Sequence, residues 1–498
     1  MSLYGQTILR GLGLLLHVPG LMALATLPVC LYFDERYAIA PFLWTAGISF
    51  AVGEAFYHLC RRAEAPRLHH GMVVAALGWL LIPLLGAVPI LWIAHRLAAL
   101  PDASLTVLAF TSPWNALFEA FSGFTGTGLS MALRESQLPA SLQWWRSLME
   151  WVGGVGVIVL MLSLLRHVLG VRHLYSSEAR EEKILPSVTS TARTIWWIYL
   201  FYTTASVLLL RAAGMPWWEA LNHGMTGIAT GGFSVTDGSM ASYGTGVRLL
   251  LLLIMVAGAI SFVTHYQVLR HGRLSALWRD AQHKALWLIL AAGAVLLLLE
   301  NRWYGGEYLW LDSVFQWASA LTTAGFQTVD LLGWSPTAKL LLSLAMILGG
   351  VAGSTCGGLK LLRVVTLYRG LRWRFQRVSL TRRQLMRYQV DGEALSEAEA
   401  DRLVRAAGVL AALWATLLWA AVLFLLHIVP HGFTLSDVIL EVASAQSNVG
   451  LSTGITHPTL LWPAKLTLIL VMWMGRLEII PVFILGAALA GGGRGPLR

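Results

Sequence analysis

Charged residues are scarce in this chain. Only 12% of its 498 residues are Asp, Glu, Lys or Arg, whereas 56% are hydrophobic. That balance excludes an ordinary soluble protein, whose surface needs far more charge. Cysteine is scarce as well. Cys30, Cys60 and Cys356 lie far apart, so neither a disulfide framework nor a zinc site is indicated.

Catalytic motifs are also missing. The sequence has no HExxH, no GxSxG and no pair of acids on one deep helix, which argues against a membrane enzyme. The stretch GGVAGSTCGGLK is only superficially like a phosphate-binding loop, because Lys360 follows a leucine and is not followed by Ser or Thr. The net charge of +10 is interpreted as the basic bias of cytoplasmic loops, and no nucleic acid is expected as a partner.

Long apolar runs, in contrast, occur from end to end. About twenty apolar residues cross a hydrocarbon core about 30 Å thick. No A-x-A-like site follows the first run, so it is interpreted as a membrane helix rather than a cleaved signal. The runs predict an all-α polytopic membrane protein with ten transmembrane helices. The expected spans are 8–32, 40–60, 71–95, 144–166, 195–213, 247–269, 285–300, 337–367, 404–427 and 463–489.

Basic residues sort to one side of this arrangement. They cluster at 61–67, 166–193, 270–284 and 360–405, between alternate pairs of spans. By the positive-inside rule that side is cytoplasmic, and both termini are expected there. The charged stretch 371–401 is expected to form a helix and a turn near phospholipid or a partner surface.

Four glycine-containing phrases fall on the opposite side. FTGTGLS, IATGGFS, TTAGFQT and SNVGLST each follow a short apolar segment. Polar residues recur thirteen and nine positions before the glycine of each phrase. They are Asn115, Glu219, Asp312 and Asp437 in the first set, and Glu119, His223, Gln316 and Glu441 in the second. The segments are too short to cross a bilayer, so each predicts a re-entrant half-helix headed by a polar or acidic first turn.

A half-helix of this kind points its partially negative end toward the membrane interior. The phrase that follows would return outward as extended backbone, which is tolerated at that depth only inside protein or beside a wet cavity. Four such segments around one axis can replace the hydration shell of a cation with carbonyl oxygens. An ordinary external turn is the alternative for one phrase, but the shared offsets argue against it for all four.

With this repeat the sequence resembles the superfamily of TrkH, KtrB and HKT potassium transporters, and most closely the TrkH branch, which has two helices before the first repeat. The resemblance implies two N-terminal helices at 1–68 and four pore repeats at 69–185, 186–280, 281–390 and 391–498. Each repeat would hold an outer helix, a pore helix, a filter loop and an inner helix, and the stretch Trp151–Leu160 resembles the first inner helix. No TVGYG occurs, so an ordinary tetrameric potassium channel is not implied.

The resemblance also implies the filter. Its glycines map onto Gly128, Gly232, Gly325 and Gly450. The residues implied to bind potassium are Thr125, Gly126, Thr127, Gly128, Ala229, Thr230, Gly231, Gly232, Thr322, Thr323, Ala324, Gly325, Ser447, Asn448, Val449 and Gly450. In this superfamily a serine in place of the first glycine favours sodium, so Gly128 favours potassium.

A gate is implied by two further stretches. The segment Gly349–Lys360 is similar to the intramembrane loop of the family, with Cys356 where another glycine is usual. Glycines weaken a helix there and hydroxyls can bond freed backbone groups, so a movable plug is expected, with a static kinked helix as the alternative. Its residues are Gly349, Gly350, Gly353, Ser354, Thr355, Gly357, Gly358 and Lys360.

The stretch GRLEII resembles the fourth inner helix of the family, whose arginine faces the pore. Arg476 is expected near the middle of span 463–489, where a charge costs at least ~2.5 kcal/mol. We expect it to form an electrostatic barrier below the filter, and an ion pair with another helix is the alternative.

The function implied is potassium uptake across a bacterial inner membrane, with K⁺ as the transported ion and no cofactor in this chain. A homodimer, contact with membrane lipid and a cytoplasmic regulatory ring like TrkA, binding NAD, ATP or ADP, are implied as well. A sodium-permeable or Na⁺/H⁺-coupled transporter of the same superfamily is the alternative.

Overall fold

The computed structural model describes residues 3–61, 63, 67–156, 187–305, 310–379, 388–391 and 393–490. The expected continuation of the first inner helix beyond Gly156 and most of the basic cluster 166–193 lie outside these residues. The first half contains α1 Leu3–Leu15, α2 His17–Tyr32, α3 Arg36–Leu59, α4 Leu68–Ala98, α5 Leu105–Ala109, α6 Pro113–Thr125, the short 3-10 turn Glu135–Gln137, α7 Ala140–Val155, α10 Val188–Ala212 and α11 Trp217–Ile228. The second half contains α12 Thr245–Gly258, α13 Phe262–His271, α14 Ala276–Arg279, α15 Ala281–Trp303, α16 Trp310–Leu321, α17 Pro336–Leu348, α18 Leu361–Ser379, β1 Tyr388–Val390, β2 Glu393–Leu395, α19 Glu397–Leu426, α20 Leu435–Ser447, α21 Trp462–Arg476 and α22 Ile480–Ala490.

The expected class, an all-α polytopic membrane protein, is confirmed. Within the described residues six helical stretches are long and apolar enough to cross a membrane: Leu3–Tyr32, α3, α4, α10, α15 and α19. The pairs α12–α13 and α21–α22, bent by 103° and 109°, raise the number to eight if each pair is one span. The other two expected spans are represented by α7, which ends beside undescribed residues, and by α17, which stops where Gly349 takes a φ of +69°.

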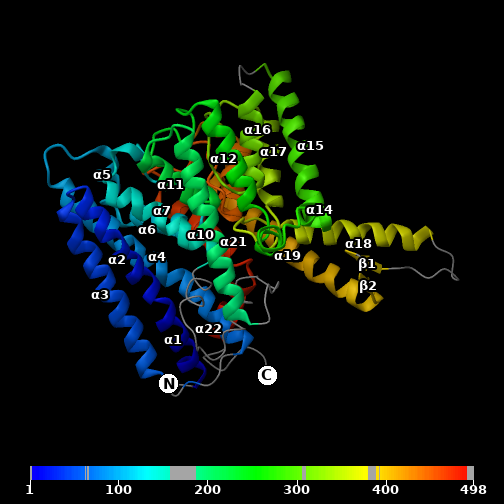
Figure 1. Cartoon of the computed structure of the whole chain (residues 1–498), viewed down its shortest axis with the longest axis horizontal. Helices are drawn as coiled ribbons and strands as arrows, with labels where there is room; N and C mark the ends of the chain where they lie inside the picture. The colour runs from blue at the N-terminus through cyan, green and yellow to red at the C-terminus, as the bar shows by residue number, and fades with distance from the viewer. Residues whose placement is uncertain are drawn as a thin grey trace.

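The N-terminal helices α1, α2 and α3 form one flank of the bundle (Figure 1). Glu35 joins the turn between α2 and α3 to α7. Its carboxylate accepts hydrogen bonds from the N–H groups of Ala140 and Ser141 at 2.7 and 2.9 Å. These N–H groups belong to the first turn of α7 and have no partner within that helix. The two extra helices therefore fix the start of the first inner helix.

The opposite flank carries α15, α18 and α19 (Figure 1). The expected helix and turn at 371–401 is more elaborate in the structure, because a β-hairpin stands before α19. Strands β1 and β2 pair antiparallel with Tyr388 opposite Leu395. A capping box formed by Ser396 and Glu399 then starts α19.

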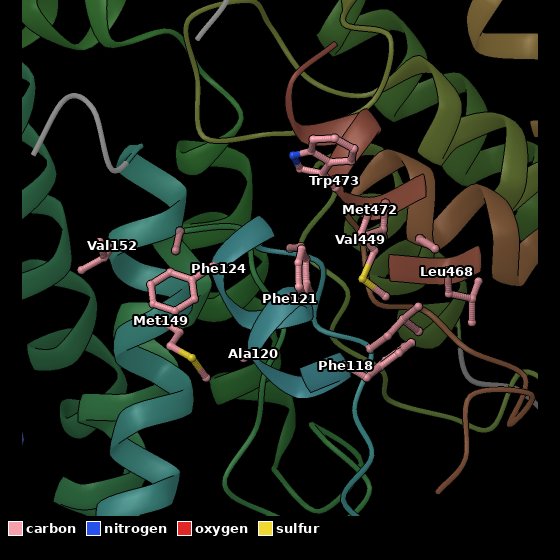
Figure 2. Packing of buried hydrophobic residues seen from close by; sticks show 14 of the residues in the cluster. Phe118, Ala120, Phe121, Phe124, Met149, Val152, Val449, Leu468, Met472 and Trp473 are labelled. Carbon is pink, nitrogen blue, oxygen red and sulfur yellow. The ribbon is translucent and has the colours of Figure 1, made fainter. Parts of the chain in front are cut away.

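The centre of the bundle is built around the short helices α6, α11, α16 and α20. Each has 12 or 13 residues, about 18–20 Å of helix at 1.5 Å per residue, which is too short to cross a bilayer. Figure 2 shows α6 between two inner helices, with Met149 of α7 on the side of Phe124 and Leu468 of α21 on the side of Phe118. Packing on both sides holds these short helices inside protein.

Candidate cation-binding site

The four short helices end in the same way. One or two residues after the end of each helix, a residue takes a left-handed conformation. The glycine of the phrase follows two positions later and also has positive φ. The first set is Gly126, Thr230, Thr323 and Asn448, with φ of 68°, 52°, 53° and 56°. The second set is Gly128, Gly232, Gly325 and Gly450, with φ of 82°, 92°, 75° and 105°. The backbone thus repeats one conformation four times, which the sequence phrases only suggested.

The four glycines close a ring. A Cβ added to Gly128 would overlap the carbonyl oxygen of Gly231 in the next loop, and one on Gly232 would overlap that of Ala324. A Cβ on Gly325 would overlap the oxygen of Val449, and one on Gly450 that of Thr127 in the first loop. The loops therefore follow one another around an axis in chain order. Each glycine lets a neighbouring carbonyl approach more closely than any side chain allows.

A polar side chain braces the outward limb of each loop. Glu119 accepts from Ser130 Oγ and Met131 N at 2.9 and 2.7 Å. The other three braces join His223 to Ser234, Gln316 to Thr328 and Glu441 to Ser452. The sequence places these four residues nine positions before the glycines but gives them no separate role. The structure shows that they lie in the middle of the short helices and support the loops.

Glu119 has a further partner. Arg146 of α7 pairs with it at 2.6 Å, and both side chains are almost fully buried. The same guanidinium donates to the carbonyl of Ser234 in the second loop at 2.9 Å. Arg146 therefore connects the braces of the first two loops and balances the charge of Glu119.

The polar residues expected in the first turns lie there, each as the third residue of its helix. Three of them contact the fourth residue of a neighbouring inner helix, and in the remaining case that residue contacts the neighbour of Glu219, which sequence reasoning missed. Arg248 pairs with Asp312 at 3.2 Å and Lys339 with Asp437 at 2.6 Å. Lys465 donates to Asn115 at 2.5 Å, and in the remaining position Gln143 accepts from Trp218 at 2.7 Å. These contacts clamp each repeat to the next at the outer ends of the helices.

The Gly-rich segment Gly349–Lys360 leaves the helical path completely, so it is not a kinked helix. Helix α17 ends at Leu348 and α18 begins at Leu361, and Gly349, Gly353, Gly358 and Lys360 have positive φ. The segment folds against the inner ends of the filter loops. Gly357 N donates to Thr323 Oγ1 at 2.9 Å, and Cys356 Sγ lies 2.8 Å from the carbonyl oxygen of Thr322.

Thr355 holds the same segment to the second repeat. Its hydroxyl donates to the carbonyl oxygens of Gly258 and Ile228 at 2.9 and 3.2 Å, and Thr230 Oγ1 is 3.1 Å away. Ser354 closes a local turn by donating to the carbonyl of Val351 at 2.6 Å. Gly350 is in close contact with Cys356, where a Cβ would lie 2.6 Å from Sγ.

The sequence predicts Arg476 near the middle of a helix, and this is wrong, because Arg476 is the last residue of α21. The chain then turns through Glu478 and Ile479, both with positive φ, and α22 leaves at 109°. The predicted span 463–489 passed over two local signals for this break, Gly475 just before it and Pro481 in the first turn of α22. Tertiary contacts also account for it, since Glu478 pairs with Lys360 at 3.0 Å and with Arg363.

The Arg476 guanidinium points into the space below the filter. It donates to the carbonyls of Gly153, Gly154 and Thr355, and its Cζ lies 5.3 Å from the ring centre of Trp79. A cavity of about 30 Å³ remains here, room for about one water molecule. Its lining includes Ser354, Gly357, Lys360, Asn448 and Arg476.

The structure thus brings the residues expected to form the filter and the gate close together, with Gly349–Lys360 and Arg476 at the C-terminal ends of the short helices. Within the described residues, no group of three or more His, Cys, Asp or Glu side chains is arranged to hold a metal ion. The four loops instead present carbonyl and hydroxyl oxygens, the ligands that suit an alkali cation.

One chain that arranges four half-helices and four glycine loops around one axis, within a helical membrane fold, defines a membrane transport protein. The family model TrkH, described as cation transport protein, matches residues 40–491. The chain belongs to this TrkH family of cation transport proteins.

Individual relatives match over almost their whole length. An uncharacterized cation transporter of Methanocaldococcus jannaschii is 32% identical over 97% of this chain and 96% of its own. The Trk system potassium uptake protein TrkH of Halomonas elongata is 30% identical over 96% of this chain and 98% of its own. The crystal structure of the potassium transporter TrkH from Vibrio parahaemolyticus has a TM-score of 0.82 and 27% identity, covering 97% of this chain and 98% of that one.

Proposed function

We propose that the protein takes up potassium through a channel-like pore. The observation that carries the proposal is the closed ring of loops, in which each filter glycine accepts the close approach of the next loop's carbonyl. Four carbonyl-lined loops at the negative ends of four half-helices favour a dehydrated monovalent cation. A membrane potential of about −100 mV is worth about 2.3 kcal/mol per charge, enough for roughly fiftyfold accumulation.

We propose that K⁺ binds along the four loop segments Thr125–Gly128, Ala229–Gly232, Thr322–Gly325 and Ser447–Gly450. The repeats around them would follow the divisions expected from the sequence, with two helices in 1–68 and pore units at 69–185, 186–280, 281–390 and 391–498. The pseudo-fourfold backbone of the loops supports this division.

The gate would consist of the segment Gly349–Lys360 and Arg476. The segment's bonds to Thr322, Thr323 and Gly258 support a plug beneath the filter. Arg476 would set a positive barrier in the same space, because its position next to the cavity opposes an approaching cation. We expect Arg476→Ala to raise the transport rate and Arg476→Lys, which keeps the charge, to raise it much less. Unchanged flux and potassium affinity in Arg476→Ala would contradict the barrier.

The relatives named for Trk potassium uptake support a multi-component system. We propose that this chain forms a homodimer in a bacterial inner membrane, with both termini cytoplasmic, and is regulated by a cytoplasmic nucleotide-binding ring like TrkA. The charged helix α18 and the α19 N-terminus are proposed as the docking side, since Arg372, Arg374 and Arg377 are exposed there.

A growth test decides the proposal. A bacterium lacking its potassium uptake systems should grow at low potassium when it expresses this chain together with a TrkA-like partner, at both low and high sodium. Failure to grow, with the protein shown in the membrane fraction, would count against potassium uptake. Growth that requires sodium would favour the sodium-coupled alternative instead.

A further inference from the structure

One buried carboxylate has no counterpart in the other repeats. The four inner helices α7, α12, α17 and α21 can be aligned on their first residues. Their fourth positions hold Gln143, Arg248, Lys339 and Lys465, and their eleventh positions hold Glu150, Met255, Met346 and Met472. All four residues at the eleventh position are buried. Three thioethers and one carboxylate therefore occupy equivalent places in the core.

Glycine contacts support this alignment independently. The fourteenth positions hold Gly153, Gly258, Gly349 and Gly475. A Cβ on Gly153 would overlap the carbonyl of Phe124, and one on Gly475 that of Gln446, while one on Gly258 would lie 2.9 Å from the carbonyl of Ile228. These three carbonyls belong to equivalent positions at the ends of α6, α20 and α11. Helices α7, α12 and α21 thus share one register against their pore helices, whereas Gly349, after the end of α17, meets the carbonyl of Gly357 instead.

Glu150 lies directly behind the second filter loop. Its two carboxylate oxygens are 3.1 and 3.0 Å from Phe233 N, which donates to them. A Cβ on Gly231 would overlap the same carboxylate. Gly231 is also the residue whose carbonyl meets Gly128 in the ring. One filter residue therefore separates the carboxylate from the proposed ion path.

The filter sequence matches this arrangement. The residues that precede the four filter glycines are Thr127, Gly231, Ala324 and Val449. Only the second loop has glycine at this position, and it is the loop with a carboxylate behind it. The missing side chain is what allows the charge to approach the loop so closely.

Glu150 forms no direct ion pair with a described residue, since the guanidinium of Arg146, one turn earlier on α7, is held by Glu119. Glu119 differs from it, because Arg146 pairs with Glu119. Glu441 also has no ion pair within the described residues, but Ser452, Thr453 and Thr456 donate hydrogen bonds to it. Within the described residues no basic side chain forms an ion pair with Glu150. A buried anion is costly unless a cation balances it.

We propose that the carboxylate of Glu150 strengthens cation binding in the filter, with the transported ion as its counter-charge. The proposal rests on the proposed potassium function and adds a fixed negative charge on one side of the ring. Glu150 acts through Gly231 and Phe233 rather than as a ligand. At an effective dielectric constant of about 20, a charge about 10 Å from a bound cation changes the affinity for that cation by roughly tenfold or more.

The test compares the wild-type protein with Glu150→Gln, which keeps the size and an acceptor for Phe233 N, and with Glu150→Met, the residue of the other three repeats. Glu54→Gln, on α3 outside the pore helices, is the control for loss of an acid. The first measurement is the concentration of K⁺ that half-saturates uptake into proteoliposomes, together with the maximal rate. The second is the rise in melting temperature when K⁺ is added to the purified protein.

We expect both Glu150 variants to need about tenfold more K⁺ for half-saturation and to lose most of the K⁺-dependent rise in melting temperature. The maximal rate of Glu150→Gln should change much less, and Glu54→Gln should behave like the wild type. An unchanged half-saturating concentration in both variants, with wild-type uptake intact, overturns the inference. A wild-type protein that does not transport or bind K⁺ would instead contradict the proposed function itself.

Discussion

The side-chain amide of Asn448 donates a 3.0 Å hydrogen bond to Thr127 Oγ1, which joins the last filter loop to the first. The same amide nitrogen donates to the carbonyl of Met472 on α21 at 3.0 Å. Asn448 has φ +56°, a conformation that asparagine tolerates better than most residues. This one side chain therefore closes the ring and fixes it to the fourth inner helix.

Replacing Asn448 with glycine should loosen the filter without straining the backbone. Asn448→Gly keeps access to positive φ but removes both hydrogen bonds, each worth about 0.5–1.5 kcal/mol net. We expect the preference for K⁺ over Na⁺ to fall several-fold in flux measurements, with expression maintained. Unaltered selectivity would mean that the closure by Asn448 does not shape the ion sites.

The ring itself should not tolerate a methyl group. In Gly325→Ala the new Cβ would overlap the carbonyl oxygen of Val449, and alanine would also be strained at φ +75°. We expect potassium uptake to be lost even where the protein still reaches the membrane. Gly47→Ala is the matched control, because nothing lies within 4 Å of a Cβ at this position in α3. Normal uptake by Gly325→Ala would contradict the close approach of the loops.

The gate segment should be released by removing one hydroxyl. Thr355→Val keeps the shape of the side chain but loses the bonds to the carbonyls of Gly258 and Ile228. A loss of 1–2 kcal/mol shifts an equilibrium by a factor of about 5–30. We therefore expect higher basal flux in proteoliposomes without the regulatory partner. Thr366→Val, an exposed hydroxyl that bonds only within α18, should leave the basal flux unchanged.

Asp280 gives a pH-dependent prediction outside the membrane spans. Burial raises the pKa of its carboxyl, but hydrogen bonds from the His283 ring and backbone, together with electrostatic attraction to His283, lower the pKa below its ordinary value overall. A lowered pKa in the folded state stabilises the fold above the ordinary value of 3.8, and this contribution is lost as the pH falls through the folded pKa.

Asp280 is also the N-cap of α15, and loss of a cap costs about 1 kcal/mol. Asp280→Ala should therefore unfold more easily than the wild type at pH 7, and the difference should shrink below about pH 4. Thermal unfolding in detergent at both pH values measures this. Asp401→Ala, which breaks an exposed pair with Arg405, should have little effect. An equal difference at both pH values would refute the charge contribution.

The sequence by itself determined the class of the protein and the places of its four loops. The length of an apolar run indicates a membrane span directly, because the thickness of the bilayer sets the number of residues needed to cross it. A glycine in such a phrase indicates a backbone position with positive φ, because other residues are sterically disfavoured in that conformation. Gly128, Gly232, Gly325 and Gly450 were therefore identifiable from local chemistry alone, as was the Gly-rich segment that interrupts the third inner helix.

The tertiary structure alone decided which residues from different repeats meet. Pro481 favours a break after Arg476 locally, but the path of the chain there depends on Glu478 reaching Lys360 and Arg363. The register of the inner helices was hidden as well, because the loops between the filter glycines and the inner helices differ in length. Glu150 belongs to the first repeat yet lies behind Gly231 of the second. Such contacts follow from the packing of whole helices around an axis, which no short stretch of sequence encodes.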